Sequence, residues 1–286
     1  MSAVAGKVCV VTGAASGIGR ALALELAARG ARGLAISDVN EEGLAETEAM
    51  LTGVEVDAER LDVADRDAWD AYATRVVTRF GTVNQIYNNA GIADHDPVVD
   101  FDIERYERML GINLWGVIYG TKALLPHLIA SGDGDVVNVS SLNGIMAQAD
   151  MSAYCTAKFG VRGFTESLAL ELSAAGHPVR AIVVHPGGVR TEIANSALAD
   201  AEASGREISD QQRRRHRFYN EQLLRMSPRK AAAIIVDGVE AERARVLVGN
   251  DARAIDALVR FLPTRWPNVF GVIERAVERR AGLQSS

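Results

Sequence analysis

Short apolar runs alternate along the chain with longer segments in which apolar residues recur every three or four positions. The short runs are continuous and rich in valine and isoleucine, as in residues 8–12 and 181–184, which is typical of strands buried on both faces of a sheet. The longer segments have the spacing of amphipathic helices. We therefore expect strands within 7–13, 33–38, 54–63, 83–91, 134–141, 179–187 and 245–249, and helices within 17–29, 41–51, 65–80, 103–130 and 155–172.

This alternation of strands and helices predicts an α/β fold. Continuous apolar strands separated by helices are expected to form a parallel sheet that is covered on both faces. The pattern therefore predicts a single doubly wound domain over residues 1–286, with a seven-stranded, mainly parallel sheet. The chain contains no internal repeat and no low-complexity segment.

Two segments depart from this alternation. Residues 192–226 are polar and charged, and we expect one or two helices there that lie over the rest of the domain. The basic run Arg213–Arg217 is typical of a solvated helix face, although it could also meet an acidic group of a ligand. Residues 252–286 are expected to form a helical extension that packs on the body or on a second subunit. Trp266 and the nearby arginines leave a membrane-surface role as the alternative.

Composition and charge narrow the class of protein. The chain has 286 residues, of which 48% are hydrophobic, and a net charge of -6, which argues against a nucleic-acid partner. Its two cysteines, Cys9 and Cys155, have no ligand-like spacing, so we expect neither disulfides nor a metal site. The N-terminus lacks the apolar stretch of a signal peptide, and no run reaches the roughly 18 apolar residues of a membrane span. We therefore expect a soluble, cytoplasmic protein without stable membrane insertion.

A glycine-rich loop follows the first expected strand and opens the first expected helix. Its sequence, TGAASGIG, spans residues 12–19 and has glycines at 13, 17 and 19. Such glycines permit a tight turn and let the backbone approach a ligand, while the helix start offers N–H groups to a pyrophosphate. A glycine pattern alone is a weak signal, but the strand before it and the helix after it meet the structural condition for nucleotide binding.

Acidic and amide residues follow the next three strands. Asp38 ends the second strand, where a carboxylate can accept hydrogen bonds from a ribose and repels a 2′-phosphate; the alternative is a cap for the helix near Glu41. No basic residue adjoins Asp38 in ISDVN, which favours NAD over NADP. Asp62 and Val63 follow the third strand and could contact adenine or cap a helix. NNAG, residues 88–91, closes the fourth strand at the edge where open α/β sheets bind ligands.

A tyrosine and a lysine stand four residues apart in YCTAK, residues 154–158. On a helix they lie on one face, about 6 Å apart along the axis, although such a pair could also arise by chance on an amphipathic helix. A tyrosine with its ordinary pKa of about 10 is a poor base at neutral pH. A cation one helical turn away favours the phenolate and lowers that pKa. An arrangement of this kind would suit proton exchange between Tyr154 and a substrate, but the pair by itself does not distinguish that role from chance placement on an amphipathic helix.

These motifs, in this order, resemble those of the short-chain dehydrogenase/reductase family: TGAASGIG, Asp38, NNAG and YCTAK. The resemblance covers about residues 7–249 and implies a Rossmann-type, NAD-binding catalytic domain. It also implies a catalytic serine thirteen residues before the tyrosine, and a catalytic asparagine in INLWG. The catalytic set that the resemblance implies is Asn113, Ser141, Tyr154 and Lys158.

The resemblance further implies which residues bind the cofactor, expected to be NAD or NADH rather than NADP. Lys158 is expected to bind the nicotinamide ribose, and Asn113 to anchor a water that connects Lys158 with solvent. HPGGVRT supplies the family's Pro-Gly motif and the threonine that meets the nicotinamide end. The expected cofactor set is Gly13, Ser16, Gly17, Ile18, Gly19, Asp38, Asp62, Val63, Asn89, Ala90, Gly91, Tyr154, Lys158, Pro186, Gly187, Val189 and Thr191.

One position departs from the family pattern. The residue before the Pro-Gly motif is commonly Asn, and here it is His185. Its imidazole is either held by hydrogen bonds in the core or is an extra titratable group near the pocket. The departure leaves the expected chemistry unchanged.

The function implied is an NAD(H)-dependent oxidoreductase that interconverts an alcohol and a ketone or aldehyde. In it Tyr154 acts as acid and base, and Ser141 hydrogen-bonds the same substrate oxygen. The alternatives are a non-catalytic NAD(H)-binding module and, less in keeping with the chain's length, an epimerase or dehydratase. The expected substrate is a mid-sized, hydrophobic small molecule of steroid, terpenoid or long-chain alcohol type. Its expected pocket residues are Ser141, Leu142, Met146, Tyr154 and Ile193.

The resemblance also implies a homodimer or homotetramer. The contacts are expected through the long helices that follow the fourth and fifth strands. Nothing in the residues themselves distinguishes the two assemblies.

Overall fold

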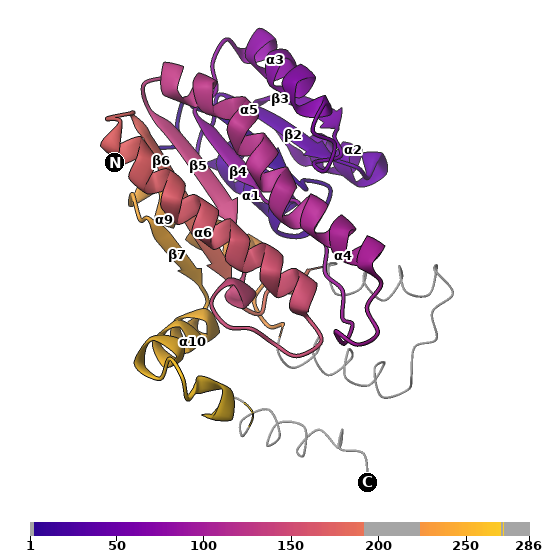
Figure 1. The fold of residues 1–286 in the computed structure, drawn as a ribbon. Coiled ribbons are helices and arrows are strands. Elements are labelled where there is room, and N and C mark those ends of the chain that lie inside the picture. The colour runs from indigo at the N-terminus through magenta and orange to yellow at the C-terminus, as the bar shows by residue number, and fades with distance from the viewer. Residues whose placement is uncertain (1–2, 192–223, 270, 272–286) are drawn as a thin grey trace.

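A computed structural model of the chain describes residues 3–191, 224–269 and 271, and within them seven strands form one sheet (Figure 1). The strands are β1 (Val8–Thr12), β2 (Gly33–Asp38), β3 (Glu55–Arg60), β4 (Gln85–Asn88), β5 (Gly134–Val139), β6 (Val179–Pro186) and β7 (Arg245–Val248). The α-helices are α1 (Gly17–Ala28), α2 (Glu41–Met50), α3 (Ala68–Phe80), α4 (Ile103–Leu110), α5 (Gly116–Ala130), α6 (Ser152–Ala174), α9 (Pro228–Glu240) and α10 (Asn250–Phe261).

Every pair of neighbouring strands in the sheet is parallel, and the strand order is β3-β2-β1-β4-β5-β6-β7. The chain moves outward from β1 to β3 and then crosses to β4 on the other side of β1. The direction of winding therefore reverses between β1 and β4, and open sheets of this kind bind ligands beyond the carboxyl ends of the strands at such a point. The predicted doubly wound α/β fold is confirmed.

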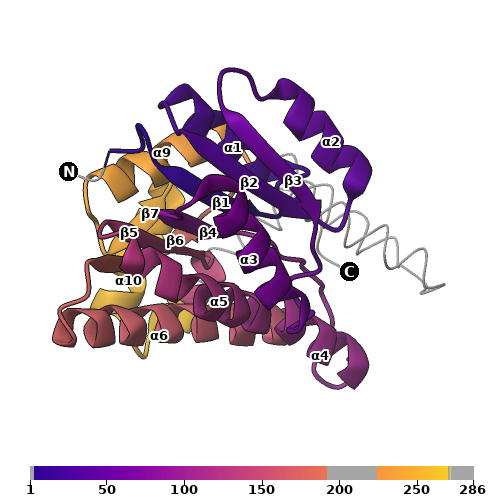
Figure 2. The same cartoon turned by 90° about the horizontal axis from the view of Figure 1, so that it is seen from above.

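Helices cover both faces of the sheet, as Figure 2 shows from above. On one face α1 and α9 pack against the strands, with Val11 of β1, Leu22 of α1 and Ile235 of α9 fully buried in one core. On the other face lie α3, α5 and α6, and there Val10 of β1 and Trp69 of α3 belong to a second core. Because successive side chains of a strand point to opposite faces, strands between two cores need apolar residues at every position.

Local signals set several of the helix ends. α2 begins after Asn40, whose side chain accepts a hydrogen bond from the Gly43 N–H at 3.1 Å. α3 ends at Gly81, which has a φ of 75° that favours glycine. α9 begins after a capping residue, Ser227, with Pro228 at its first position. These capping residues therefore set where α2 and α9 begin and where α3 ends.

The helical region predicted over 103–130 contains a break that periodicity did not indicate. α4 ends at Leu110, a π-helical turn occupies Gly111–Trp115, and α5 continues from Gly116. A π-helical turn inserts an extra residue into the helical circuit and occurs often at functional sites. Apolar residues continue through this turn, so the spacing of the sequence looks helical throughout. Asn113, from the expected catalytic set, lies inside the turn.

Two predicted segments lie partly outside the described residues. Of the polar segment 192–226, only residues 224–226 are described, and the basic run Arg213–Arg217 is outside them. Of the extension 252–286, residues 252–269 and 271 are described, and they include most of α10. The division of the chain as a single domain stays a prediction. Among the described residues, no helix combines the length and the apolar character needed to cross a membrane.

Candidate active site

The loops after β1 and β4 meet where the winding of the sheet reverses. The hydroxyl of Thr12 accepts hydrogen bonds from the backbone N–H groups of Asn89, at 3.0 Å, and Ala90, at 3.1 Å. The side-chain amide of Asn89 donates in return to the Thr12 carbonyl at 3.0 Å and to the Gly13 carbonyl at 3.3 Å. These bonds join the glycine-rich loop and NNAG into one ledge at the carboxyl edge of the sheet.

The glycine-rich loop has backbone where side chains would otherwise stand. A Cβ on Gly13 would lie 2.7 Å from the Cα of Ala90, and a Cβ on Gly19 would lie 2.0 Å from the carbonyl oxygen of Gly13. Gly13 and Gly17 also have positive φ values of 68° and 55°. Ser16 is the N-cap residue of α1, but its side chain caps no N–H of the helix, which leaves the first turn to bind an anion. This cradle fits the pyrophosphate of a dinucleotide.

Asp38, at the end of β2, forms a hydrogen bond with the glycine-rich loop. One carboxylate oxygen accepts a hydrogen bond from the Ala15 N–H at 3.0 Å, and the other accepts one from the Asn40 N–H at 3.0 Å. The cap of α2 belongs to Asn40, so the alternative role of Asp38 as that helix cap does not apply. The guanidinium of Arg20 is engaged nearby by the carbonyls of Ala15 and Gly43 and by Glu46.

Asp62 and Val63 follow β3 near Asp38, because the Leu61 N–H donates to the Asp38 carbonyl at 3.1 Å. The Asp62 carboxylate accepts a hydrogen bond from the Ala64 N–H at 2.9 Å, which closes a local turn and does not cap α3. Val63 is buried, and its carbonyl accepts a hydrogen bond from the indole of Trp69 at 3.0 Å. Exposed Asp62 is therefore the residue of the pair that faces solvent.

Tyr154 and Lys158 lie one turn apart near the start of α6. The Lys158 ammonium is 5.6 Å from the centroid of the Tyr154 ring and donates a hydrogen bond to the Val139 carbonyl at 3.0 Å. Lys158 is only 4% exposed, and this burial lowers the pKa of its ammonium to about 8. The hydroxyl of Ser140 donates to the Lys158 carbonyl at 2.8 Å, which ties the helix to the end of β5. The structure thus brings the predicted pair together around a buried positive charge.

Ser141 begins the short helical turn Leu142–Gly144 directly after β5. Its hydroxyl accepts a hydrogen bond from the Asn143 N–H at 3.1 Å, and its carbonyl accepts one from the Gly144 N–H at 3.0 Å. Nδ1 of His185, on β6, lies 2.8 Å from the same carbonyl. Burial lowers the pKa of His185 to about 4, so the ring is neutral and Nδ1 carries the proton that the carbonyl accepts.

His185 is therefore a core residue that supports the backbone of Ser141. Its side chain is fully buried, and its Nε2 has no hydrogen-bond partner among the described residues. This favours the first of the two roles considered for the departure from Asn, although only one of the two ring nitrogens is bonded.

Asn113 approaches the same region from the π-helical turn. Its amide oxygen accepts a hydrogen bond from the Ile92 N–H at 2.8 Å, and its amide nitrogen donates to the Ile92 carbonyl at 2.7 Å. A Cβ on Gly91 would lie 2.9 Å from the Asn113 amide oxygen and 3.5 Å from the Lys158 ammonium. Gly91 therefore lets the π-helical turn, the end of NNAG and Lys158 meet.

The segment from the last residue of β6 onward, residues 186–191, completes this edge of the sheet. Gly187 N–H donates to the Val248 carbonyl at 3.0 Å, and Val189 N–H donates to the Gly187 carbonyl at 2.9 Å. A Cβ on Gly17 would lie 3.4 Å from the Cβ of Thr191, so this loop reaches the glycine-rich loop. We call residues 186–191 the Pro-Gly loop.

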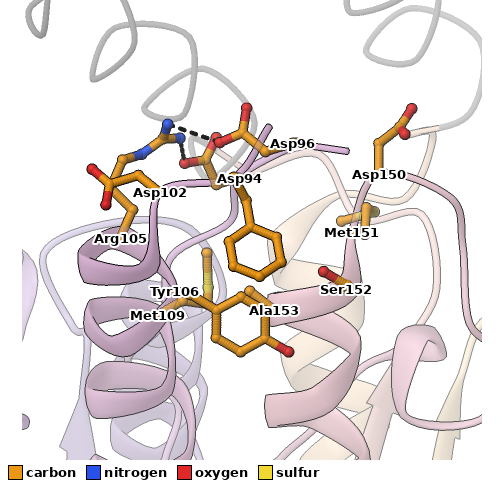
Figure 3. A pocket seen from close by; sticks show the side chains of 11 residues that line it. Asp94, Asp96, Asp102, Arg105, Tyr106, Met109, Asp150, Met151, Ser152 and Ala153 are labelled. Carbon is orange, nitrogen blue, oxygen red and sulfur yellow. Dashed lines mark hydrogen bonds and ion pairs between the residues drawn. The ribbon is translucent and has the colours of Figure 1, made fainter. Parts of the chain in front are cut away.

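A pocket lies at the N-terminal end of α6 (Figure 3). Asp94, Asp96, Asp102 and Asp150 line it together with Arg105, which pairs with Asp94 and Asp96, as the dashed lines in Figure 3 show. Its remaining lining residues are Phe101, Tyr106, Met109, Met151, Ser152 and Ala153.

This pocket differs from the one expected from the sequence. Neither Ser141 nor Tyr154 lines it, and Met146, an expected pocket residue, is 1% exposed. Leu142 is partly buried and is also absent from the lining, while Ile193 lies outside the described residues. The segment ADHDP, residues 93–97, which begins two residues after NNAG, was the available signal for its charged wall.

The structure thus gathers most of the expected site residues at one edge of the sheet, around the reversal between β1 and β4. Ile18, in the first turn of α1, is partly buried against the core on that face of the sheet. Among the described residues, no group of three or more His, Cys, Asp or Glu side chains is placed to hold a metal ion.

Comparisons with known proteins agree with this arrangement. A family model described as short chain dehydrogenase matches residues 7–202. The chain is 50% identical over 265 residues to the oxidoreductase SadH of Mycobacterium tuberculosis, which covers 92% of this chain and 93% of the relative. It is 37% identical over 195 residues to trans-4-hydroxycyclohexanecarboxylate dehydrogenase of Sinomonas cyclohexanicum, covering 66% of this chain and 74% of that relative.

A solved structure has the same architecture. It is a short chain dehydrogenase/reductase from Burkholderia phymatum in complex with NAD, with a TM-score of 0.83 and 27% identity over 92% of this chain and 95% of that one. The family model spans the glycine-rich loop, NNAG and YCTAK, and the SadH match extends over nearly the full length of both chains. The chain therefore belongs to the short-chain dehydrogenase/reductase family of oxidoreductases.

Proposed function

We propose that this protein is an NAD(H)-dependent oxidoreductase that interconverts a secondary alcohol and a ketone, or a primary alcohol and an aldehyde. The observation that carries the proposal is the buried Lys158 ammonium, 5.6 Å from the Tyr154 ring centroid. This pair lies at the carboxyl edge of the sheet, together with the glycine cradle and the Pro-Gly loop. A phenol beside a cation, next to a dinucleotide cradle, is suited to proton exchange coupled to hydride transfer.

The residues of the cradle would hold the cofactor. The N–H groups at the start of α1 would bind the pyrophosphate, and Asp38 would bind the adenine ribose. The cofactor, when bound, supplies the nicotinamide carbon that accepts or returns a hydride. Asn89 to Gly91 and the Pro-Gly loop would enclose its nicotinamide end.

Tyr154 would exchange the proton at the substrate oxygen. Lys158 favours the phenolate electrostatically, so the phenolate would accept the alcohol proton during oxidation, and the resulting phenol would return a proton during reduction. Burial lowers the pKa of Lys158 to about 8, so its ammonium is still protonated at neutral pH and can act in this way. The Val139 carbonyl holds the ammonium in place at 3.0 Å.

Ser141 would bind the same substrate oxygen and stabilise charge as it develops. The Asn143 N–H donates a hydrogen bond to the Ser141 hydroxyl, and the His185 ring and the Gly144 N–H donate to the Ser141 carbonyl. These three bonds fix the position of Ser141. Asn113 would position the loop at Gly91 through its two bonds to Ile92. In the same proposal it anchors a water that connects Lys158 with solvent.

NAD rather than NADP is the proposed cofactor. Asp38 places a carboxylate beside the end of the glycine-rich loop, where it would repel a 2′-phosphate. The nearby cation, Arg20, is bound to Ala15, Gly43 and Glu46, which opposes its use as a phosphate ligand.

The proposed substrate is a mid-sized, hydrophobic alcohol or ketone. One relative is named for a hydroxylated cyclohexane carboxylate, so ring-bearing secondary alcohols belong in the first assays beside steroids, terpenoids and long-chain alcohols. Turnover of any of these with NAD would support the proposal. Absence of turnover across the panel, with tight NADH binding retained, would favour a non-catalytic binding module instead.

An epimerase or dehydratase is the less favoured alternative. The relatives reported above are named as an oxidoreductase and a dehydrogenase, which supports net oxidation or reduction of the substrate. Accumulation of NADH during turnover would separate the two, because an epimerase returns its hydride to the substrate.

A homodimer or homotetramer belongs to the same proposal. Trp115 at the end of the π-helical turn is 48% exposed and stacks on Tyr119 of α5, while Phe159 and Leu170 of α6 are 40% and 74% exposed. Exposed aromatic and aliphatic residues on two neighbouring helices are typical of a subunit contact.

We also propose a cytoplasmic location. Cys9 and Cys155 are both buried free thiols, as is usual in a reducing compartment.

Tyr154→Phe is expected to lower kcat at least about 1,000-fold, because it removes the group that exchanges the proton. The Kd for NADH, measured by fluorescence titration, should stay within about twofold of the wild-type value. Tyr119→Phe, which also removes one phenol hydroxyl but keeps the ring stack, is the control and should retain activity. Normal turnover by Tyr154→Phe would show that another group transfers the proton.

Asp38→Asn is expected to raise the NADP/NAD ratio of kcat/KM at least about tenfold, because it removes the charge that repels a 2′-phosphate. Its amide oxygen can still accept the Ala15 N–H, so the loop should keep its shape. Asp38→Ala should relax the preference as well and also weaken binding of both cofactors, since it loses the bonds to Ala15 and Asn40. An unchanged ratio in both variants would limit Asp38 to support of the loop.

Lys158→Met is expected to abolish turnover and yet stabilise the cofactor-free protein at pH 7 by roughly 1–3 kcal/mol. Burial lowers the pKa of Lys158 from 10.5 to about 8, so below pH 8 the folded state carries a charge that is costly to bury. As pH rises above about 8 the folded state loses this proton, and near pH 10.5 the unfolded state loses it as well. The cost is therefore relieved between these two pH values.

Urea unfolding of both proteins at pH 7 and near pH 10.5 measures this difference. The gain should be present at the lower pH and largely absent at the higher one. Lys122→Met, at an exposed lysine of α5, should change the free energy of unfolding by less than about 0.5 kcal/mol. A loss of stability at pH 7 in Lys158→Met would contradict the argument.

Phe159→Glu is expected to dissociate the proposed assembly, because it puts a charge into an apolar contact. Light scattering after size-exclusion chromatography would report the loss of mass. Met50→Glu, at a residue of α2 that is 50% exposed, is the matched control and should leave the mass unchanged. If Phe159→Glu keeps the wild-type mass, the contact does not involve this face of α6.

A further inference from the structure

The helix α10, which follows β7, contacts the Pro-Gly loop directly. Asp251, in its first turn, accepts a hydrogen bond from the backbone N–H of Gly188 at 2.6 Å. In Figure 1, α10 follows directly from β7, the strand that pairs with β6. A carboxylate that accepts from a backbone N–H forms one of the stronger hydrogen bonds in proteins.

The carboxylate of Asp251 fills space that two glycines leave open. A Cβ on Gly187 would lie 2.3 Å from one carboxylate oxygen and 2.4 Å from the other. A Cβ on Gly249 would lie 2.3 Å from the nearer oxygen, and Gly249 has a φ of 112°. The absence of side chains at both positions therefore lets the carboxylate lie against the backbone of the loop. Glycine at 187 is required by this contact, whether or not a cofactor also needs it.

The remaining bonds of the loop leave the Gly188 N–H to Asp251. Met226 N–H donates to the Gly188 carbonyl at 3.2 Å, and Arg190 N–H donates to the Met226 carbonyl at 2.9 Å. These bonds hold the loop from the side of Met226, whereas Asp251 holds its turn from the side of α10. Thr191 follows this turn and lies close to Gly17 of the cradle.

Other contacts keep α10 in place independently of Asp251. Asp256, in its middle, pairs with Arg245 of β7 at 3.2 Å, and Arg245 also pairs with Glu166 of α6. Asp256 pairs in addition with Arg260 of the same helix at 2.7 Å. Ala252, next to Asp251, is fully buried. A variant of Asp251 should therefore leave the helix docked and change the loop alone.

We propose that Asp251 is a positioning residue that holds the Pro-Gly loop in the conformation that receives the nicotinamide end of the cofactor. The inference rests on the proposed function, because it needs the loop to bind NAD(H). Asp251 acts through the Gly188 N–H and does not itself touch substrate or cofactor. A loop that is already ordered costs less free energy to bind a ligand than one that must be ordered on binding. The C-terminal helix thereby contributes to cofactor affinity from outside the cofactor cradle.

A purely structural role for Asp251 would have a different signature. An acidic side chain in the first turn stabilises a helix through the helix dipole, whatever it bonds to. Such a role depends on the charge, so Asp251→Asn would lose it, as Asp251→Ala would. The positioning role depends on an oxygen acceptor, so Asp251→Asn should retain it. The two substitutions together therefore distinguish the roles.

The experiment is a fluorescence titration of the full-length, cofactor-free protein with NADH. Asp251→Ala is expected to raise the Kd about tenfold, whereas Asp251→Asn should stay within about threefold of wild type. Asp256→Asn removes a carboxylate from the same helix but not from the loop, and its amide oxygen can still accept a hydrogen bond from Arg245. This variant is the matched control and should stay within about twofold. Steady-state assays should show a raised KM for NAD in Asp251→Ala, with kcat at saturating NAD within about threefold of wild type.

The possible outcomes distinguish failure of the positioning role of Asp251 from failure of the proposed function. A wild-type protein that binds no NADH would overturn the proposed function. Wild-type binding with Asp251→Ala unchanged would overturn the positioning role alone. Equal weakening in Asp251→Asn and Asp251→Ala would also overturn it, because the effect would then follow the charge rather than the hydrogen bond to Gly188.

Discussion

The Lys158 ammonium is buried at a point where four separate segments of the chain meet. The Val139 carbonyl at the end of β5 accepts a hydrogen bond from it, Gly91 after β4 leaves the space beside it, and Asn113 approaches from the π-helical turn. Tyr154 lies one turn away on the same helix. Taking a charge out of water is costly, and few contacts here offset that cost, so burial lowers the pKa of Lys158 to about 8. The fold accepts that cost in order to hold a cation next to a phenol.

Several side chains at the same edge hold the backbone of the loops around the proposed cofactor site. Asp38, the proposed ribose-binding residue, accepts the N–H groups of Ala15 and Asn40 with its two oxygens. Arg20 joins the glycine-rich loop to α2, and Asp251 joins the Pro-Gly loop to α10. Because these side chains bond to backbone, the loops around the proposed cofactor site are ordered by the protein itself. Preorganisation of this kind lowers the entropic cost of binding.

The pocket beside α6 is lined by charged residues, whereas the apolar residues after Ser141 led us to expect a hydrophobic substrate pocket. Arg105 joins Asp94 and Asp96, and the Asp96 N–H donates to the Asp150 carbonyl at 2.8 Å, so two loops distant in sequence form one wall. These contacts tie the segment after NNAG to the start of α6.

The succession of strands and helices along the chain, and the two loops with candidate ligand-binding motifs, could be predicted from local patterns, because continuous apolar runs, glycines and helix caps act over a few neighbouring residues. The spacing of Tyr154 and Lys158 likewise determined that they share a helix face. The order of the strands within the sheet came from the tertiary structure. Three further features required the tertiary structure: the π-helical turn at Asn113, the burial of Lys158, and the contact of Asp251 with the Pro-Gly loop. The last joins residues 63 positions apart, and the burial depends on strands and helices from the whole chain. Contacts of that kind form only when the sheet assembles, so the short-range periodicity of the sequence does not predict them.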